Sequence, residues 1–287
     1  MKTLIQNYSS GLSTEAMYFN QCLREGGLES HIWADGQISA FDIFDAVKPD
    51  IFISHYKFIT TDIIKYLKQA KNIPMVLNVT GTNEQEIQQI ESLYSENNIK
   101  TPFLFTNSYD SIEKFKPKKL KLVNILPSVD VFLSPIPTID FQVDLAIIGT
   151  KSNNLIDETT KDKQSYHLLS LGVENENFDL PVDLKSLGGL YDKYKEMILI
   201  DDVNVVSSQI FFEASLKARK LSVKVDQSQQ STLDKIIPTL FDKGSDSNSI
   251  RQQIKKKHTC FNRTARLARF LNNEEVSKKL KSISEQL

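Results

Sequence analysis

The sequence has 287 residues, of which 40% are hydrophobic and 25% are charged, and its formal net charge is −1. This length suits two α/β domains of ordinary size, and the composition is typical of a globular protein with buried cores. A sequence pI near 6.5 argues against a protein held on nucleic acid or anionic lipid by bulk charge alone.

The first residues lack the apolar core of a signal peptide, and no apolar run approaches the ~20 residues that a membrane-spanning helix needs. Cys22 and Cys260 lie far apart in the sequence and form no C-x-x-C pair, so neither a zinc site nor a disulfide framework is indicated. We therefore expect a cytoplasmic protein without a bound metal.

In the first half, short apolar runs alternate with helical patterns. The predicted strands cover residues 3–8, 31–34, 50–55, 75–79, 103–106 and 122–126, and the predicted helices cover residues 14–25, 40–47, 61–70 and 84–97. Strands separated by helices of this length predict βαβ units around a parallel sheet.

A proline-rich connector at residues 134–138 separates this half from a second one in which the alternation restarts. Strands are predicted at residues 143–148, 197–200 and 221–225, with a helix at 208–217 and a charged helical remainder from residue 232. The sequence therefore predicts two domains, residues 1–137 and residues 138–287, the second carrying the terminal helices. Because parallel sheets bind ligands beyond the carboxyl ends of their strands, we expect two binding regions that face one cleft.

The segment from Ser207 to Ala218 carries the most specific pattern. Ser207 and Ser208 begin the predicted helix, where free N–H groups bind anions. Glu213, one turn inside, can accept two hydrogen bonds, as the hydroxyls of a ribose would donate. The alternative is an ordinary surface pair of Glu213 with Lys217, worth only ~0.2–0.5 kcal/mol.

This segment resembles the signature helix of GT-B glycosyltransferases, in which an F-E-A core follows a strand and binds the sugar nucleotide. Three further stretches resemble the CgeB-like "group 1" branch: L-P-S-V-D at 126–130, V-D-L-A-I-I-G at 143–149 and H-T-C-F-N-R-T-A at 258–265. The resemblance implies two facing Rossmann-like domains, each with a parallel sheet. It also implies sugar transfer from a nucleoside diphosphate, expected to be UDP, to an acceptor hydroxyl without a catalytic metal or other cofactor.

Under this resemblance Glu213 binds the ribose, while Ser207, Ser208, Gln209 and Lys217 lie against the nucleotide sugar. One departure concerns the glycine that usually follows the F-E-A core. Here residues 217–220 read Lys-Ala-Arg-Lys, which puts a side chain where the backbone would approach the ligand. The lysine could instead supply positive charge to a diphosphate.

A second candidate for phosphate binding follows the predicted strand at 143–148. Gly149 permits a close approach of the backbone, Thr150 follows it, and Lys151 could neutralise a phosphate. A simple turn at the end of the strand is the alternative interpretation.

In the first domain, loops that follow strands are expected to border the acceptor, and they contain Ser9, Ser10, Gly11 and Thr80. His55 ends the third predicted strand, and its imidazole is the candidate catalytic base that takes a proton from an acceptor hydroxyl. The alternative is a histidine that serves only as a structural hydrogen-bonding group.

The sequence leaves three alternatives for the acceptor: a surface glycan, a small metabolite or modified duplex DNA. A lysine-, asparagine- and isoleucine-rich, glycine-poor chain resembles tailed-phage proteins, and some phages glycosylate hydroxymethylcytosine with enzymes of this fold, which would place the protein in host cytoplasm. Basic stretches at residues 114–121 and 255–258 could contact a phosphate backbone, and Arg263, Arg266 and Arg269 could extend that surface along one helix. Ordinary solvated faces are the alternative interpretation of these residues. The near-neutral pI argues against DNA as the acceptor.

Two other classes of protein are considered. A non-catalytic GT-B-like binding module is supported by the missing glycine after the F-E-A core. A Rossmann oxidoreductase is disfavoured, because no G-x-G-x-x-G motif follows a predicted strand.

Overall fold

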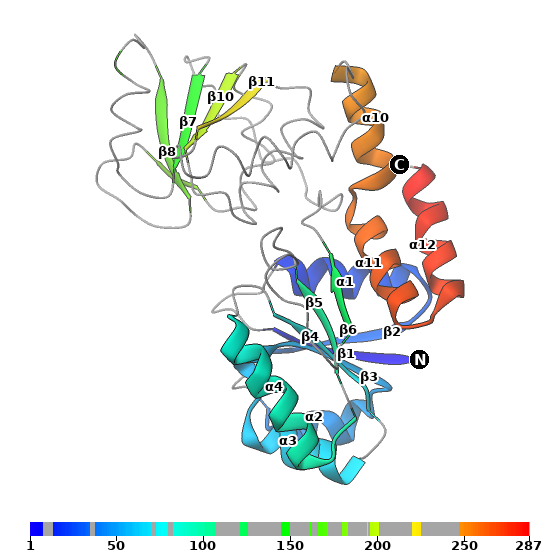
Figure 1. Cartoon of the computed structure of the whole chain (residues 1–287). Helices are drawn as coiled ribbons and strands as arrows, with labels where there is room; N and C mark the ends of the chain where they lie inside the picture. The colour runs from blue at the N-terminus through cyan, green and yellow to red at the C-terminus, as the bar shows by residue number, and fades with distance from the viewer. Residues whose placement is uncertain are drawn as a thin grey trace. The chain divides into compact units, whose positions relative to one another are not determined.

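The computed structural model describes most of the first half of the chain, parts of the second half and the C-terminal helices. The described residues are 1–7, 14–34, 38–70, 73–79, 83–100, 102–106, 121–125, 145–149, 161, 166–171, 180–182, 194, 196–200, 220–224 and 247–286. The chain divides into two units (Figure 1): Met1–Leu126 together with Cys260–Leu287, and Pro127–Thr259.

The first unit is built on a six-stranded sheet in the order β2-β1-β3-β4-β5-β6, in which every neighbouring pair is parallel. The strands are β1 Lys2–Asn7, β2 Glu29–Ala34, β3 Ile51–His55, β4 Met75–Asn78, β5 Phe103–Thr106 and β6 Lys121–Asn124. The helices are α1 Thr14–Glu25, α2 Ala40–Val47, α3 Thr61–Ala70 and α4 Glu84–Asn97, with a 3-10 turn, η1, at Tyr56–Phe58. These four helices have the predicted bounds, and the strands agree within two residues.

Local signals in the sequence explain where these helices begin and end. Ser39 caps α2 by accepting a hydrogen bond from the Asp42 N–H, and Asn83 and Glu86 form a capping box at the start of α4. Lys48 and Asn98 end the same two helices in the left-handed conformation, each with a φ of 50°.

Helices cover both faces of the sheet (Figure 1). On one face, residues of α2, α3 and α4 such as Phe44, Leu67 and Ile90 pack against Leu4 and Phe52 of the strands. Tyr94 belongs to this core; its hydroxyl donates to the Met75 sulfur at 3.7 Å, and burial raises its pKa. A parallel sheet requires such cover on both faces.

The opposite face is covered by α1 and by α11 (Cys260–Phe270), which is followed by α12 (Glu274–Gln286). Leu267 of α11 packs with Ile5, Phe19 and Phe105 in one core, and the Phe270 ring meets the Phe103 ring edge-on at 5.4 Å. Residues 260–287 were predicted to belong to the second domain. The structure places them on the first unit, because the apolar side of α11 covers sheet surface that α1 leaves open.

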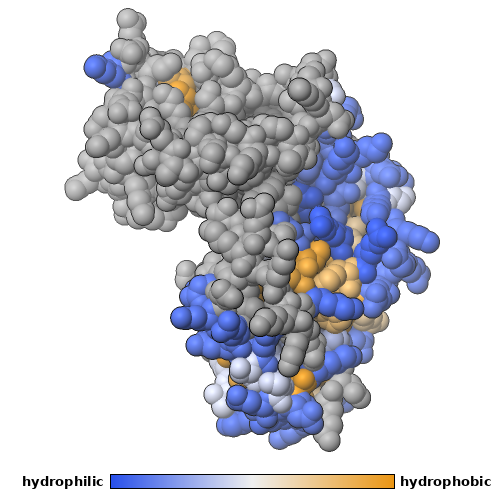
Figure 2. Space-filling view, in the orientation of Figure 1, coloured by the Kyte–Doolittle hydropathy of each residue, from blue (hydrophilic) through white to orange (hydrophobic). Residues whose placement is uncertain are grey.

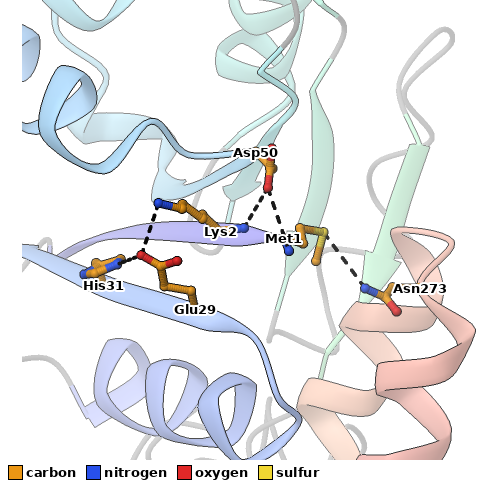
Figure 3. Close-up of polar contacts among 6 residues, drawn as sticks. All are labelled: Met1, Lys2, Glu29, His31, Asp50 and Asn273. Carbon is orange, nitrogen blue, oxygen red and sulfur yellow. Dashed lines mark hydrogen bonds and ion pairs between the residues drawn. The ribbon is translucent and has the colours of Figure 1, made fainter.

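Charged groups at the amino ends of the strands pair with one another (Figure 3). The Lys2 N–H donates to Asp50 at 2.7 Å, and Glu29 accepts from His31 at 3.0 Å and contacts the Lys2 ammonium at 3.4 Å. The hydrogen bond from His31, then the neighbouring Lys2, lowers the pKa of Glu29. Asn273, between α11 and α12, contacts the Met1 sulfur at 3.9 Å, which ties the C-terminal helices to this end of the sheet.

The second unit contains a five-stranded parallel sheet in the order β11-β10-β7-β8-β9, and the helix α10 at Ser247–Lys257. Its strands are β7 Leu145–Gly149, β8 His167–Leu171, β9 Leu180–Val182, β10 Glu196–Ile200 and β11 Lys220–Lys224. The strands β8 and β9 were not predicted from the sequence. The three residues of β9 include Pro181, which a strand tolerates at the outside of a sheet and which reads as a loop in sequence.

We predict that Leu267→Ala destabilises the first unit by about 2–5 kcal/mol, because it leaves a cavity between α11 and the sheet. The neighbouring Arg266 is exposed, so Arg266→Ala should change stability by less than about 0.5 kcal/mol. Urea unfolding followed by the fluorescence of the single tryptophan, Trp33, reports on this unit, since Trp33 lies in its core. Equal stability of the two variants would show that α11 does not complete the core.

Candidate functional site

The strand order of the first unit reverses beside β1. The chain passes from β1 to β2 on one side, and β3 then lies on the other side of β1. Open α/β sheets bind ligands at such a switch point, beyond the carboxyl ends of the strands. The register pairs Ile5 with Ile53, so Asn7 and His55, which end β1 and β3, lie at the same level.

Side chains that can form hydrogen bonds end five adjacent strands here, and we call these residues the polar rim: Asn7, His55, Asn78, Thr106 and Asn124. The register places His55 beside Asn78 and Thr106 beside Asn124. Asn7, Asn78 and Thr106 are buried. Five strands of this sheet therefore end in amide, hydroxyl or imidazole side chains.

A buried hydrogen-bond chain fixes the switch point. The Ser54 hydroxyl donates to Gln6 Oε1 at 2.6 Å, and Gln6 Nε2 donates to the Phe58 carbonyl at 3.4 Å. Both Gln6 and Ser54 are 0% exposed. Since buried polar groups are strongly favoured to keep their partners, these contacts hold the ends of β1 and β3 and the turn η1 in one arrangement.

His55 lies at the carboxyl end of β3, as sequence analysis expected. Its Nδ1 accepts a hydrogen bond from the Lys57 N–H at 3.2 Å and thereby caps η1. Because Nδ1 is the acceptor, the neutral ring carries its proton on Nε2. In this arrangement Nε2 can donate a hydrogen bond but cannot take up a proton. The catalytic role of His55 stays a prediction, and the geometry favours a donor over a base.

The turn η1 is also fixed from α4. The Tyr56 hydroxyl donates to Gln89 at 3.3 Å, and the Lys57 ammonium lies 3.8 Å from the Glu86 carboxylate. Partial burial and the charge of Glu86 raise the pKa of Tyr56, so this hydroxyl stays protonated at neutral pH. The turn beyond β3 is thus held by β1, β3 and α4 together.

The second unit has its own switch point, between β7 and β10. The chain passes from β7 to β8 and β9 on one side, and then returns to β10 and β11 on the other. Gly149, the last residue of β7, is in register with Ile200, the last residue of β10. A predicted phosphate-binding glycine therefore ends one of the two strands between which ligands bind in open sheets.

The remaining predicted site residues lie outside the described residues. They are Thr150, Lys151, Ser207, Ser208, Gln209, Glu213 and Lys217 on the nucleotide side, and Ser9, Ser10, Gly11 and Thr80 on the acceptor side. The connector at 134–138 and the predicted helix at 208–217 also lie there. Their proposed roles stay predictions.

The roles of Gln6 and Ser54 at the switch point were not predicted from the sequence, and neither was the place of Thr106 in the polar rim. The available signal was the interruption of apolar strands by adjacent polar residues, as in Ile5-Gln6-Asn7 and Ile53-Ser54-His55. A lone buried polar residue needs a partner, and the pairing across β1 and β3 supplies it.

The H-T-x-x-x-R stretch is buried. His258, Thr259 and Arg263 are at most 7% exposed, whereas Arg266 and Arg269 are exposed. The three arginines therefore do not form one continuous basic stripe, and that part of the argument for DNA binding is wrong. Lys256 and Lys257 at the end of α10 are exposed.

Neither a metal cluster nor a membrane-spanning helix is found in the described ranges. No group of three or more His, Cys, Asp or Glu side chains there could hold a metal ion. Of the helices within those ranges, none is long and apolar enough to cross a membrane.

No protein-family model and no curated protein sequence matches the chain. Among solved structures, Anabaena Alr3699/HepE in complex with UDP and glucose is 10% identical, with a TM-score of 0.52, and the match covers 100% of this chain and 95% of that chain. The glycosyltransferase SnogD from Streptomyces nogalater is 12% identical, with a TM-score of 0.47, covering 94% and 98%. The UDP-GlcNAc 2-epimerase from Neisseria meningitidis, bound to UDP-GlcNAc, is 12% identical, with a TM-score of 0.43, covering 98% and 94%.

At this level of identity the similarity to HepE establishes the fold. With its two parallel α/β sheets, the chain has the GT-B architecture of glycosyltransferases, as the sequence predicted.

We predict that Ser54→Ala destabilises the first unit by about 1–3 kcal/mol, because it leaves the buried Gln6 oxygen without its donor. Ser282, which is exposed on α12, offers a matched control, and Ser282→Ala should stay within about 0.5 kcal/mol of the parent. Unfolding in urea followed by Trp33 fluorescence measures both. A loss no larger than that of the control would remove the hydrogen-bond chain from the account of the switch point.

Proposed function

We propose that this chain is a metal-independent glycosyltransferase that moves a sugar from UDP or a similar nucleoside diphosphate to an acceptor hydroxyl. The observation that carries the proposal is the presence of two parallel sheets, each with a switch point at which open α/β sheets bind ligands. The similarity to HepE, whose structure holds UDP and glucose, supports a nucleotide sugar as one of the ligands.

The donor side of the proposal is the switch point of the second unit. Gly149 ends β7 beside the end of β10, and in sequence Thr150 and Lys151 follow Gly149. We assign the diphosphate to this end of the sheet, with backbone N–H groups and Lys151 as its partners. The segment that follows β10 supplies Ser207, Ser208 and Gln209 for the phosphates, Glu213 for the ribose and Lys217 for the remaining charge.

The acceptor side of the proposal is the polar rim of the first unit, together with Ser9, Ser10, Gly11 and Thr80. His55 is proposed to position the acceptor through a hydrogen bond that Nε2 donates. Donors fixed before the reaction begins stabilise developing charge without reorganisation. This is why the rigid attachment of η1 by Gln6 and α4 matters for the proposed transfer.

Two further proposals concern the identity of the acceptor and the alternative of a binding module without catalysis. Hydroxymethylcytosine in duplex DNA stays a predicted acceptor, supported by the exposed lysines that end α10. A binding module without catalysis is supported by the lysine in place of the usual glycine after the F-E-A core. Turnover of a nucleotide sugar distinguishes an enzyme from a module.

The donor assignment predicts stabilisation by nucleotides in a thermal-shift screen. UDP or a UDP-sugar at a hundred times its dissociation constant should add about 2.7 kcal/mol to the stability of the parent protein. Glu213→Ala should weaken binding by roughly 10- to 150-fold, the equivalent of a charge-assisted hydrogen bond worth about 1.5–3 kcal/mol. Addition of EDTA should leave both binding and turnover unchanged.

The matched control is Glu275→Ala, since Glu275 is exposed in the first turn of α12. It should bind UDP as the parent does. Undiminished binding by Glu213→Ala would remove Glu213 from the nucleotide site. If no nucleoside diphosphate or nucleotide sugar binds the parent protein, the proposed function is wrong.

A further inference from the structure

The surface of the first unit is mainly hydrophilic on the face in view (Figure 2), but some polar side chains are buried inside the unit. In the described part of the chain, three buried oxygens in adjacent elements lack a hydrogen-bond partner within the protein. They are Thr3 Oγ1 in β1, Ser30 Oγ in β2 and Asn20 Oδ1 in α1. Because buried polar groups in folded proteins are rarely left unsatisfied, we looked for one ligand that serves all three.

Thr3 and Ser30 lie side by side on one face of the sheet. They are partners in the register of β1 and β2. Side chains alternate between the two faces of a strand, so Thr3 is on the same face as Ile5, which packs with residues of α1. Ser30 is on the face opposite to that of Trp33, which packs in the core on the other side. Both hydroxyls are therefore on the side that α1 covers, and the two residues are 1% and 7% exposed.

Asn20 reaches the same place from α1. It comes four residues after Ala16 and three before Leu23, which both pack against this face of the sheet, so it shares their side of the helix. The Leu28 N–H donates to the Leu23 carbonyl at 3.0 Å, which brings the start of β2 to the last turn of α1.

The heights along the sheet also agree. From the bond between Leu28 and Leu23, Asn20 lies three residues back along the helix, about 4.5 Å. Ser30 lies two residues forward along the strand, about 6.6 Å. A helix that joins two parallel strands runs opposite to them, so both distances lead toward the carboxyl end of the sheet. Asn20 therefore lies at about the level of Ser30 and its neighbour Thr3.

The hydrogen-bonding groups of these three side chains complement one water molecule. A buried water typically makes about three hydrogen bonds to polar groups that otherwise lack partners. Asn20 Oδ1 can only accept, whereas each hydroxyl can donate or accept. A water between them donates to Asn20 Oδ1 and to one hydroxyl, and accepts from the other. None of the three oxygens is charged, which favours water over a metal cation, since hard cations prefer carboxylates.

We infer that one internal water molecule joins α1 to β1 and β2, with Thr3 Oγ1, Ser30 Oγ and Asn20 Oδ1 as its partners. This water fixes α1 on the two strands at one side of the switch point. The inference goes beyond the proposed glycosyl transfer and does not depend on it, because the water is part of the fold.

A high-resolution crystal structure of the full chain tests the site directly. We expect an ordered water within about 2.7–3.2 Å of all three oxygens. A direct hydrogen bond between the Thr3 and Ser30 hydroxyls, or side chains that close together with no water between them, would overturn the inference.

Stability gives a second test, because a bridging water and an unsatisfied hydroxyl predict opposite results. Thr3→Val keeps the branched shape of the side chain but removes the hydroxyl. It should lower the folding equilibrium constant by roughly 5- to 150-fold, since the water and its other partners lose a buried hydrogen bond. Removal of a hydroxyl that has no partner would instead leave stability unchanged or raise it, and that result contradicts the inference.

The matched control is Thr61→Val, because Thr61 is exposed in the first turn of α3. It should change the folding equilibrium constant by less than about threefold. Urea unfolding followed by Trp33 fluorescence measures both variants. A loss in Thr3→Val no larger than that of the control would also count against the water.

Discussion

A parallel sheet with both faces covered is the constraint on which the architecture of the first unit depends. Its strands bury hydrophobic side chains on both faces, and α1 covers one of these faces only in part. The end of the chain therefore returns, and α11 places Leu267 against Ile5, Phe19 and Phe105. The strand order reverses beside β1, and open α/β sheets bind ligands at such a point, beyond the carboxyl ends of the strands.

The same constraint explains why polar residues are found where the strands end. Gln6 and Ser54 are fully buried in the sheet. The Ser54 hydroxyl donates a hydrogen bond to Gln6, and Gln6 donates one to the Phe58 carbonyl in the turn that follows β3. Their hydrogen bonds convert the end of β3 into a fixed support for His55 and Phe58. In the proposed transfer, such rigid placement would let the His55 donor orient the acceptor before the reaction.

Much of the first unit could be predicted from its sequence, because its helices carry local signals that agree with the fold. Ser39 and Asn83 mark helix starts, and continuous apolar runs mark the buried strands. The return of α11 to the first unit could not be predicted in this way, since an amphipathic helix does not specify which sheet it covers. The short strand β9 contains Pro181, a residue typical of loops, and was therefore not predicted. The role of Gln6 depends on Ser54, a partner 48 residues away.

The features of the candidate site also divide into those that the sequence could predict and those that it could not. Strand ends such as His55 and Gly149 could be predicted, because a strand followed by a polar or glycine-containing loop is a local pattern. The tautomer of His55 could not, since it depends on the Lys57 N–H that the turn η1 brings to Nδ1.

A crystal structure of the chain with UDP tests the proposed donor site directly. We expect the diphosphate to lie beyond the carboxyl ends of β7 and β10, with an oxygen within about 3 Å of a backbone N–H after Gly149. We also expect the ribose hydroxyls to donate hydrogen bonds to Glu213. A diphosphate bound at the polar rim of the first unit, or at a surface remote from both switch points, would contradict the proposed donor site.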